Sequence, residues 1–133
     1  MSDESTLVIL KPDAVRRGLV GEILGRFERK GLRIESMRTM QVDRDLAEHH
    51  YAEHVDKPFF ADLVGFITSG PVVVARIGGR EAVSVVRGLM GATDPARSAP
   101  GTIRGDYGLE ITENLVHGSD SPESAARELD LFF

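Results

Sequence analysis

The sequence predicts an α+β fold in which helices cover a four-stranded antiparallel sheet. Two short runs of continuous apolar and β-branched residues, 6–10 and 72–75, are typical of strands that are buried on both faces. Amphipathic helical patterns follow both runs, and two further strand patterns complete a βαββαβ order with extra helices inserted. This order is that of the ferredoxin-like layout, and we expect its helices to pack mainly on one face of the sheet.

The first half of the chain supplies two strands and two helices. The first strand should end at Lys11, because Pro12 cannot continue a central ladder. Residues 19–31 place apolar side chains at helical spacing and close with a glycine. In residues 32–42 the apolar side chains lie at positions an even number of residues apart, as on one face of a strand, which predicts a second strand. Asp45 starts a capping-box pattern, so a second helix should run from there to about His54.

The second half alternates helices and strands around one long loop. Residues 92–108 lack periodicity and contain two prolines, which predicts an ordered functional loop rather than a simple connection. The other elements, in order, are a helix from Phe60, a strand at 72–75 that Gly78 and Gly79 should end, a helix at 82–89, a strand at 114–117 and a helix from Pro122.

The composition narrows the class of protein. With 133 residues and no linker-like segment, the chain is expected to form one domain spanning residues 1–133. Its net charge of −5 argues against a general nucleic-acid binder or a protein attracted to anionic membranes. No apolar run approaches the roughly 18 residues that cross a bilayer, and the N-terminus lacks the pattern of a secretory signal. The absence of cysteine excludes thiolate chemistry and fits a cytoplasmic location, which we expect.

One short segment matches a metal-binding pattern. His50 to His54 reads H-x-x-E-H, the pattern of inverted zinc proteases. The two histidines would share one face if the helix expected from Asp45 continued to His54. A zinc hydrolase would also need a third ligand and a substrate cleft, and such proteases are usually larger domains. We therefore expect a solvated helix face here, and metal analysis of the protein would decide between the two.

The segment from Asn114 to Ser121 places a histidine where a strand ends and a helix is about to begin. Ser121 can cap the free backbone N–H groups, and Pro122 suits the first helical position. At such a place His117 can act as a nucleophile, transfer a proton, bind a metal or simply complete the structure. Glu128, about two turns into the helix, either orders a serine or the imidazole, or is solvated.

Three cations stand at the ends of predicted elements, where they can reach an anion. Lys11 ends the first strand, Arg87 falls near a helix end, and Arg104 lies between turn residues of the long loop. Each has the alternative role of a surface or helix-end charge. Phe59 and Phe60 are adjacent in a helix and cannot face the same way, so one should be core and the other an exposed surface on which a base can stack.

Taken together, these motifs resemble the nucleoside diphosphate kinase family. The likeness covers nearly the whole chain in order, and the Asn-x-x-His-Gly-Ser-Asp motif is highly specific. The resemblance implies transfer of the terminal phosphate of a nucleoside triphosphate to a nucleoside diphosphate, by ping-pong turnover through a phosphohistidine with Mg²⁺ on the nucleotide phosphates. The segments that carry it are 6–13 with its Lys-Pro-Asp, 18–31, 51–60, 69–71, 100–106 with its Gly-Thr-Ile-Arg-Gly-Asp, and 114–121.

The resemblance also implies a role for each motif residue. His117 is the nucleophile, through its Nδ1, and Glu128 and Ser119 orient it. The other implied roles are these: Tyr51 lies close to the transferred phosphate; Arg87, Thr93 and Arg104 hold the phosphates; Lys11 and Asn114 bind the sugar hydroxyls, with Lys11 also reaching phosphate; Phe59 stacks on the base; and Asp120 helps to place magnesium through water.

Two further expectations follow from the family. Stacking on one phenylalanine discriminates little between bases, so we expect broad nucleotide tolerance. The family forms homo-oligomers, and we expect a hexamer, with a tetramer or a dimer as alternatives. A non-catalytic member, using the same fold only to bind nucleotide, is the competing interpretation, and the presence of every motif residue disfavours it.

Overall fold

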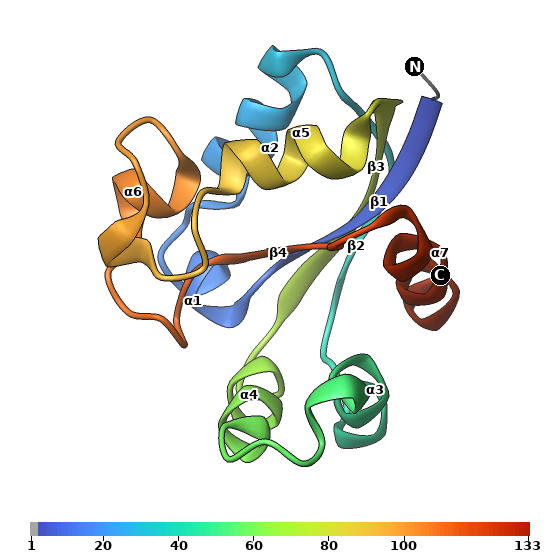
Figure 1. Cartoon of the computed structure of the whole chain (residues 1–133), viewed down its shortest axis with the longest axis vertical. Helices are drawn as coiled ribbons and strands as arrows, with labels where there is room; N and C mark the ends of the chain where they lie inside the picture. Colours follow the sequence, from blue (N-terminus) through green and yellow to red (C-terminus); the bar gives the residue numbers. More distant parts are fainter. Residues whose placement is uncertain (1–2) are drawn as a thin grey trace.

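Four antiparallel strands form one sheet in the order β2-β3-β1-β4 (Figure 1). The computed structural model describes residues 3–133, so the first two residues of the expected domain lie outside it. The two continuous apolar runs occupy the two central strands, which confirms the predicted sheet. The strands are β1 (Asp3–Leu10), β2 (Arg33–Met40), β3 (Val72–Arg80) and β4 (Val116–Gly118).

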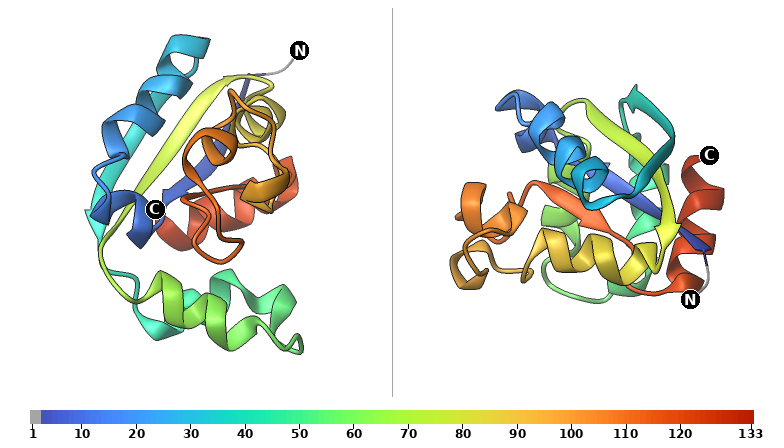
Figure 2. Two further views of the ribbon diagram at one scale, coloured as in Figure 1. Left: turned by 90° about the vertical axis from the view of Figure 1, so that its left-hand side faces the viewer. Right: turned by 90° about the horizontal axis from the view of Figure 1, so that it is seen from above.

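Helices cover both faces of this sheet, whereas the sequence predicted them mainly on one (Figures 1 and 2). Val8 and Leu10 of β1 belong to a core with α2 (Val20–Lys30) and α5 (Ala82–Met90). Leu7 and Ile9 belong to a second core, which contains side chains of three other helices. A strand that is apolar on both faces needs cover on both, which explains the second layer. The helices of that layer are α3 (Arg44–His50), α4 (Phe60–Ile67) and α7 (Pro122–Phe132).

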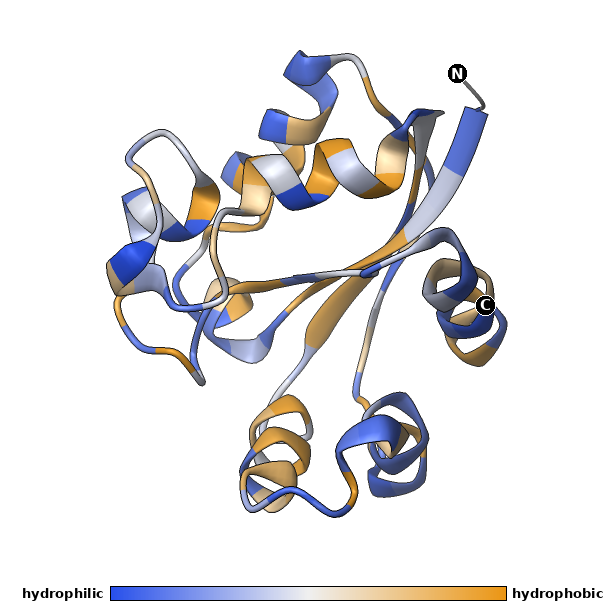
Figure 3. Ribbon diagram, viewed as in Figure 1, coloured by the Kyte–Doolittle hydropathy of each residue, from blue (hydrophilic) through white to orange (hydrophobic). Residues whose placement is uncertain are grey.

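The hydropathy of the ribbon follows these two cores. In Figure 3 apolar residues run along the middle of the sheet, while α3 is largely hydrophilic. Strand β2 lies at the edge of the sheet and departs from the simple alternation that predicted it. A bulge between Ile34 and Ser36 shifts its register against β3 by one residue. A shift of one residue exchanges the two faces of a strand. Ile34 and Met40, an even number of residues apart, would share a face in a regular strand, but Ile34 packs against the first core and Met40 against the second.

Two of the predicted boundaries change in the structure. Asp43, not Asp45, caps α3, because its side chain accepts from the backbone N–H of Leu46 at 2.8 Å. The strand at 72–75 continues through Gly78 and Gly79 to Arg80. The Glu35 side chain occupies the space where a Cβ at position 78 would lie, so Gly78 permits close approach rather than ending the strand.

The ends of two helices agree with the sequence. Gly31 takes a left-handed conformation, with φ of 108°, directly after α2. Ser121 caps α7 by accepting from the N–H of Ser124 at 3.1 Å, and Pro122 fills the first helical position.

The long loop is ordered, as predicted, and holds two short helical segments. Within residues 3–133, no helix has the length and apolar character to cross a bilayer. The short elements of the chain are α1 (Pro12–Arg16), η1 (Ala52–His54), η2 (Pro95–Arg97) and α6 (Ile103–Tyr107).

Candidate active site

A cleft of about 530 Å³ gathers residues from both halves of the chain. The ends of β1 and β4, the α3–α4 segment, the C-terminal part of α5, the long loop and α7 all contribute side chains to its wall. Of the predicted site residues, Ser119 does not line the cleft but lies fully buried behind it. Those that line it are Lys11, Tyr51, Phe59, Arg87, Thr93, Arg104, Asn114, His117, Asp120 and Glu128.

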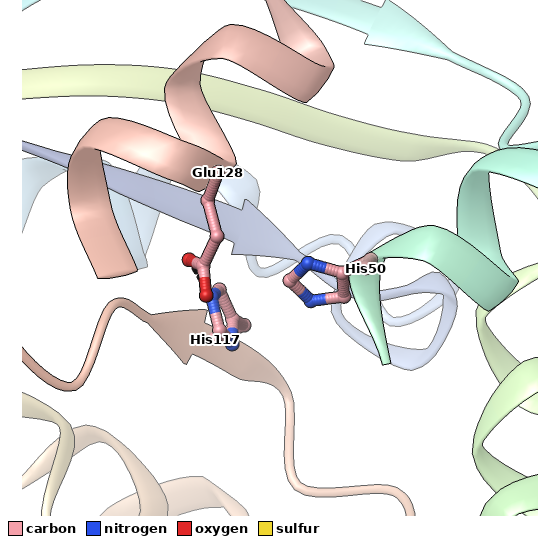
Figure 4. Close-up of side chains that lie close together, drawn as sticks. All are labelled: His50, His117 and Glu128. Carbon is pink, nitrogen blue, oxygen red and sulfur yellow. Dashed lines mark hydrogen bonds and ion pairs between the residues drawn. The ribbon is translucent and has the colours of Figure 1, made fainter. Parts of the chain in front are cut away.

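The imidazole of His117 is held by a buried carboxylate (Figure 4). Glu128, on α7, has an oxygen 2.7 Å from Nε2 of His117, and that side chain is one of the buried charged groups of the chain. Ser119 donates its hydroxyl to the same oxygen at 2.7 Å and accepts from the backbone N–H of Leu7 at 3.3 Å. The solvated alternative for Glu128 is therefore wrong, because His117 of β4 and the following Ser119, itself bonded to β1, hold the carboxylate.

The charge on Glu128 sets the state of the ring. Burial alone would raise the pKa of Glu128, but the hydrogen bonds from His117 and Ser119 outweigh it and lower this pKa to about 2. An ionised carboxylate can only accept a hydrogen bond, so Nε2 of His117 must carry the proton and donate it. In the neutral ring Nδ1 then keeps its lone pair, and this is the nitrogen able to attack an electrophile.

Arg104 brings a buried positive charge to the cleft. Its guanidinium donates to the backbone oxygens of Val116 at 2.6 Å, Asn114 at 3.2 Å and Gly91 at 3.2 Å. Burial, and then the nearby charge of Arg87, lower the pKa of Arg104 to about 10, which leaves it charged at neutral pH. Because these acceptors are neutral, the charge is available to attract an anion in the cleft.

Lys11 is the second buried cation. Its ammonium donates to Oδ1 of Asn114 at 2.8 Å, and the amide of Asn114 donates to the carbonyl of Thr93 at 2.9 Å. Burial, and then the charge of Arg104, lower the pKa of Lys11 to about 8, although Asp13 opposes this. The lysine, the asparagine and the long loop are thus held together on one side of the cleft.

A strained turn before β4 sets the positions of these groups. Leu115 has a positive φ of 76°, which is rare for a residue with a side chain, and Val116 donates its N–H to the carbonyl of Asn114 at 2.9 Å. The backbone N–H of Leu115 is bonded to a carboxylate oxygen of Asp13 at 3.1 Å, and its carbonyl accepts from the N–H of Lys11 at 2.9 Å. The surrounding hydrogen bonds therefore maintain the strain at the site.

The mouth of the cleft carries exposed polar and aromatic groups. Arg87 donates to the carbonyl of Gly118 at 3.0 Å and lies 3.7 Å from a carboxylate oxygen of Asp120. Phe59 is 43% exposed, whereas Phe60 packs against the second core, so the predicted division between the two rings is confirmed. Tyr51 is half-buried in the wall, and burial together with the charge of Glu128 raises the pKa of its phenol.

His50 belongs to the site, although the sequence placed it on a solvated helix face. The expected solvated face is wrong for it: His50 is 5% exposed, and neither ring nitrogen has a hydrogen-bond partner within residues 3–133. Its ring centroid lies 4.7 Å from that of His117, at 81°. Helix α3 ends at His50 and a 3₁₀ turn follows, so His54 does not share an α-helical face with it. The metal-capable group of residues 3–133 joins His50 to His117 and Glu128 instead.

Two further residues of the site had weak signals in the sequence. Asp13 was noted only within the Lys-Pro-Asp motif, yet it is 2% exposed and anchors Leu115. Arg127 lines the cleft and lies 3.7 Å from the second oxygen of Glu128. Its position next to Glu128 on the helix was the available signal.

Fold and cleft together define a class of protein: an α+β protein whose cleft holds buried cations beside a histidine paired with a buried carboxylate. The family model for nucleoside diphosphate kinase matches residues 4–133. The chain belongs to the nucleoside diphosphate kinase family and is a kinase that acts on nucleotides.

Similar proteins span almost the whole chain. The nucleoside diphosphate kinase of Rubrobacter xylanophilus is 65% identical over 130 residues, covering 98% of this chain and 98% of that protein. That of Archaeoglobus fulgidus is 60% identical over 130 residues, covering 98% of this chain and 86% of the relative. The solved structure of the Halobacterium salinarum enzyme in complex with CDP has a TM-score of 0.97 at 54% identity, covering 99% of this chain and 88% of that one.

Proposed function

We propose that this enzyme moves the terminal phosphate of a nucleoside triphosphate to a nucleoside diphosphate in two half-reactions, with His117 as the temporary carrier. The observation that carries the proposal is the pairing of Nε2 of His117 with the ionised Glu128 in a cleft that also holds Lys11 and Arg104. A histidine fixed through one nitrogen offers the other as a nucleophile. We propose that residues 1–133 form a single nucleoside diphosphate kinase domain.

In the first half-reaction, Nδ1 of His117 attacks the γ-phosphorus of the donor. The new N–P bond forms as the bond to the oxygen that bridges the β- and γ-phosphorus breaks, and the diphosphate leaves with the electron pair. In the second, a terminal oxygen of the acceptor diphosphate attacks the same phosphorus, and the N–P electrons return to Nδ1. Glu128 stabilises the positive charge that the ring acquires while it is phosphorylated. Using one carrier for both steps lets one cleft serve donor and acceptor in turn.

The cations of the cleft hold the phosphates. Phosphoryl transfer depends mostly on positioning and charge stabilisation, and a guanidinium about 5 Å from a phosphate charge contributes roughly 3 kcal/mol at an effective dielectric of about 20. Arg104 and Arg87 supply such charges, Thr93 adds a hydroxyl, and the Tyr51 phenol lies beside the transferred group. A protein with an overall charge of −5 can thereby bind a polyanion locally.

The remaining cleft residues recognise the nucleoside. Lys11 and Asn114 bind the sugar hydroxyls, and the hydrogen bond between the two side chains supports a shared role. Phe59 offers an exposed ring for stacking, and a stacked ring accepts every base, so the enzyme tolerates different bases. The CDP bound by the Halobacterium salinarum relative supports a nucleotide in this cleft.

Mg²⁺ is the metal that we propose to accompany the nucleotide. The exposed carboxylate of Asp120 at the cleft mouth fits a cation that takes most of its ligands from phosphates and water. When bound, Mg²⁺ neutralises phosphate charge during transfer. Asp120 would hold it through water, and Arg87 would donate to phosphate oxygens alongside it.

Assembly and location complete the proposal. Within the described residues, β2 is an edge strand of the sheet and carries Met37, which is 57% exposed, and this supports association between chains. We propose a hexamer, with a tetramer or dimer as alternatives that sedimentation equilibrium distinguishes. The cysteine-free sequence supports a cytoplasmic location.

Trapping the carrier tests this function. Purified protein mixed with Mg²⁺ and γ-labelled ATP, without acceptor, should gain a label that is acid-labile and alkali-stable. His117→Ala should abolish it, whereas His49→Ala, at an exposed histidine outside the cleft, should retain it. Labelling that persists in His117→Ala would overturn the proposal, and nucleotide binding without any labelling would indicate the non-catalytic alternative.

A further inference from the structure

We propose that His50, His117 and Glu128 form an inhibitory site for a transition-metal ion, with Zn²⁺ as the fitting ion, inside the same cleft. Each residue offers one ligand atom, and these atoms lie within 4.8 Å of one another. Figure 4 shows the three side chains converging from α3, β4 and α7. The metal binding stands on this geometry alone, while its inhibitory effect rests on the function proposed above.

The donor set suits zinc rather than magnesium. Two imidazole nitrogens and one carboxylate oxygen are the ligands of several catalytic zinc sites, where a fourth position is left open for water. Zinc–nitrogen bonds of about 2.0–2.1 Å place tetrahedral donor atoms about 3.4 Å apart. Side-chain rotations that move the donor atoms by roughly 1 Å would therefore bring them to zinc-binding distance. Mg²⁺ prefers six oxygen ligands and has little affinity for such a set, so it does not compete for it.

His50 is the residue that distinguishes this group from a simple nucleophile with its carboxylate. Its imidazole is buried, and both nitrogens lack hydrogen-bond partners in the described part of the chain, which is uncommon for a polar side chain in a protein interior. The rings of His117 and Phe132 hold it edge-on, with centroids 4.7 and 5.4 Å away. A metal ion between the two imidazoles would satisfy one of these nitrogens.

Metal binding would act on the chemical step. The ion takes the place of the proton on Nε2 of His117, which is released to solvent, and Glu128 becomes a ligand instead of a hydrogen-bond acceptor. A metal on Nε2 withdraws electron density from the ring and makes Nδ1 a poorer nucleophile. Lys11 and Arg104 are not ligands, so nucleotide binding is retained. Zinc should therefore lower kcat with little change in KM.

Calorimetry with ZnCl₂ on the nucleotide-free protein tests the site directly. One zinc per chain should bind, with a buffer-dependent heat that reports proton release. Loss of an outer-shell partner weakens metal sites about 10- to 100-fold, so His50→Phe, which removes a direct ligand, should weaken binding roughly 100-fold or more. His54→Phe is the matched control, because His54 lies in the cleft wall but outside the group. Equal zinc affinity in both variants would overturn the site.

Kinetics then separates this inference from the proposed function. At saturating Mg²⁺, each protein is assayed with and without zinc, and each variant is compared with its own zinc-free rate. Wild type and His54→Phe should lose kcat, and His50→Phe should resist. Equal inhibition of the two variants would contradict the inference. Absence of phosphorylated His117 in zinc-free wild type would instead refute the carrier mechanism and leave the calorimetric result standing.

Discussion

Replacing Glu128 by glutamine removes one negative charge from the cleft while keeping its shape. The carboxylate oxygen lies 2.7 Å from Nε2 of His117, and the side chain is 4% exposed, so solvent screens the interaction little. A hydrogen bond to a charged group contributes about 1.5–3 kcal/mol. The ring becomes positive only as the N–P bond forms, so most of this contribution belongs to the transition state. Glu128→Gln should therefore slow phosphorylation roughly 10- to 100-fold.

Rapid-quench measurement of labelled His117 in a single turnover is the suitable assay. The rate at saturating nucleotide should fall, while the nucleotide concentration for half-maximal rate should stay near the wild-type value because Lys11 and Arg104 are untouched. Glu123→Gln is the matched control, since Glu123 is exposed in the first turn of the same helix. A wild-type rate in Glu128→Gln would refute the assignment of the carboxylate.

Three further predictions concern the walls of the cleft. A lysine is charged only below its pKa, which is about 8 for Lys11. In steady-state assays, KM for the nucleotide should therefore rise between about pH 7 and pH 9, and this rise should be smaller in Lys11→Arg. Arg104→Lys keeps the charge but leaves buried carbonyls without donors, so urea denaturation should show a loss of about 1–3 kcal/mol of stability, and an unchanged midpoint would contradict this. Phe59→Ala should raise KM roughly 5- to 100-fold for purine and pyrimidine nucleotides alike, and a selective effect on one base would argue against simple stacking.

The sequence predicts much of this fold because its strongest signals are local. The apolar runs of β1 and β3, the glycine after α2 and the cap of α7 depend on neighbours in the chain, and the structure confirms them. The bulge at Ile34 and the distribution of helices over both faces depend on the partner strand and on packing, which no local pattern reports.

The candidate site divides in the same way. Its motif residues were predicted, and ten of the predicted positions line the cleft, but their hydrogen bonds could not be read from spacing. The choice between a solvated and a buried Glu128 depended on how α7 packs against β1. His50 was assigned to a solvated face because a zinc site needed a third ligand that the local pattern did not supply, whereas its ring is buried with its centroid 4.7 Å from that of His117.

Nitrogen-15 NMR of the His117 ring, before and after phosphorylation, tests the central claim most directly. In the resting enzyme Nε2 should carry the proton that Glu128 accepts and Nδ1 should be unprotonated. After reaction with Mg²⁺ and ATP, phosphorus coupling should appear on Nδ1. Phosphorus bonded to Nε2, or a resting ring protonated on Nδ1 instead of Nε2, would contradict the account.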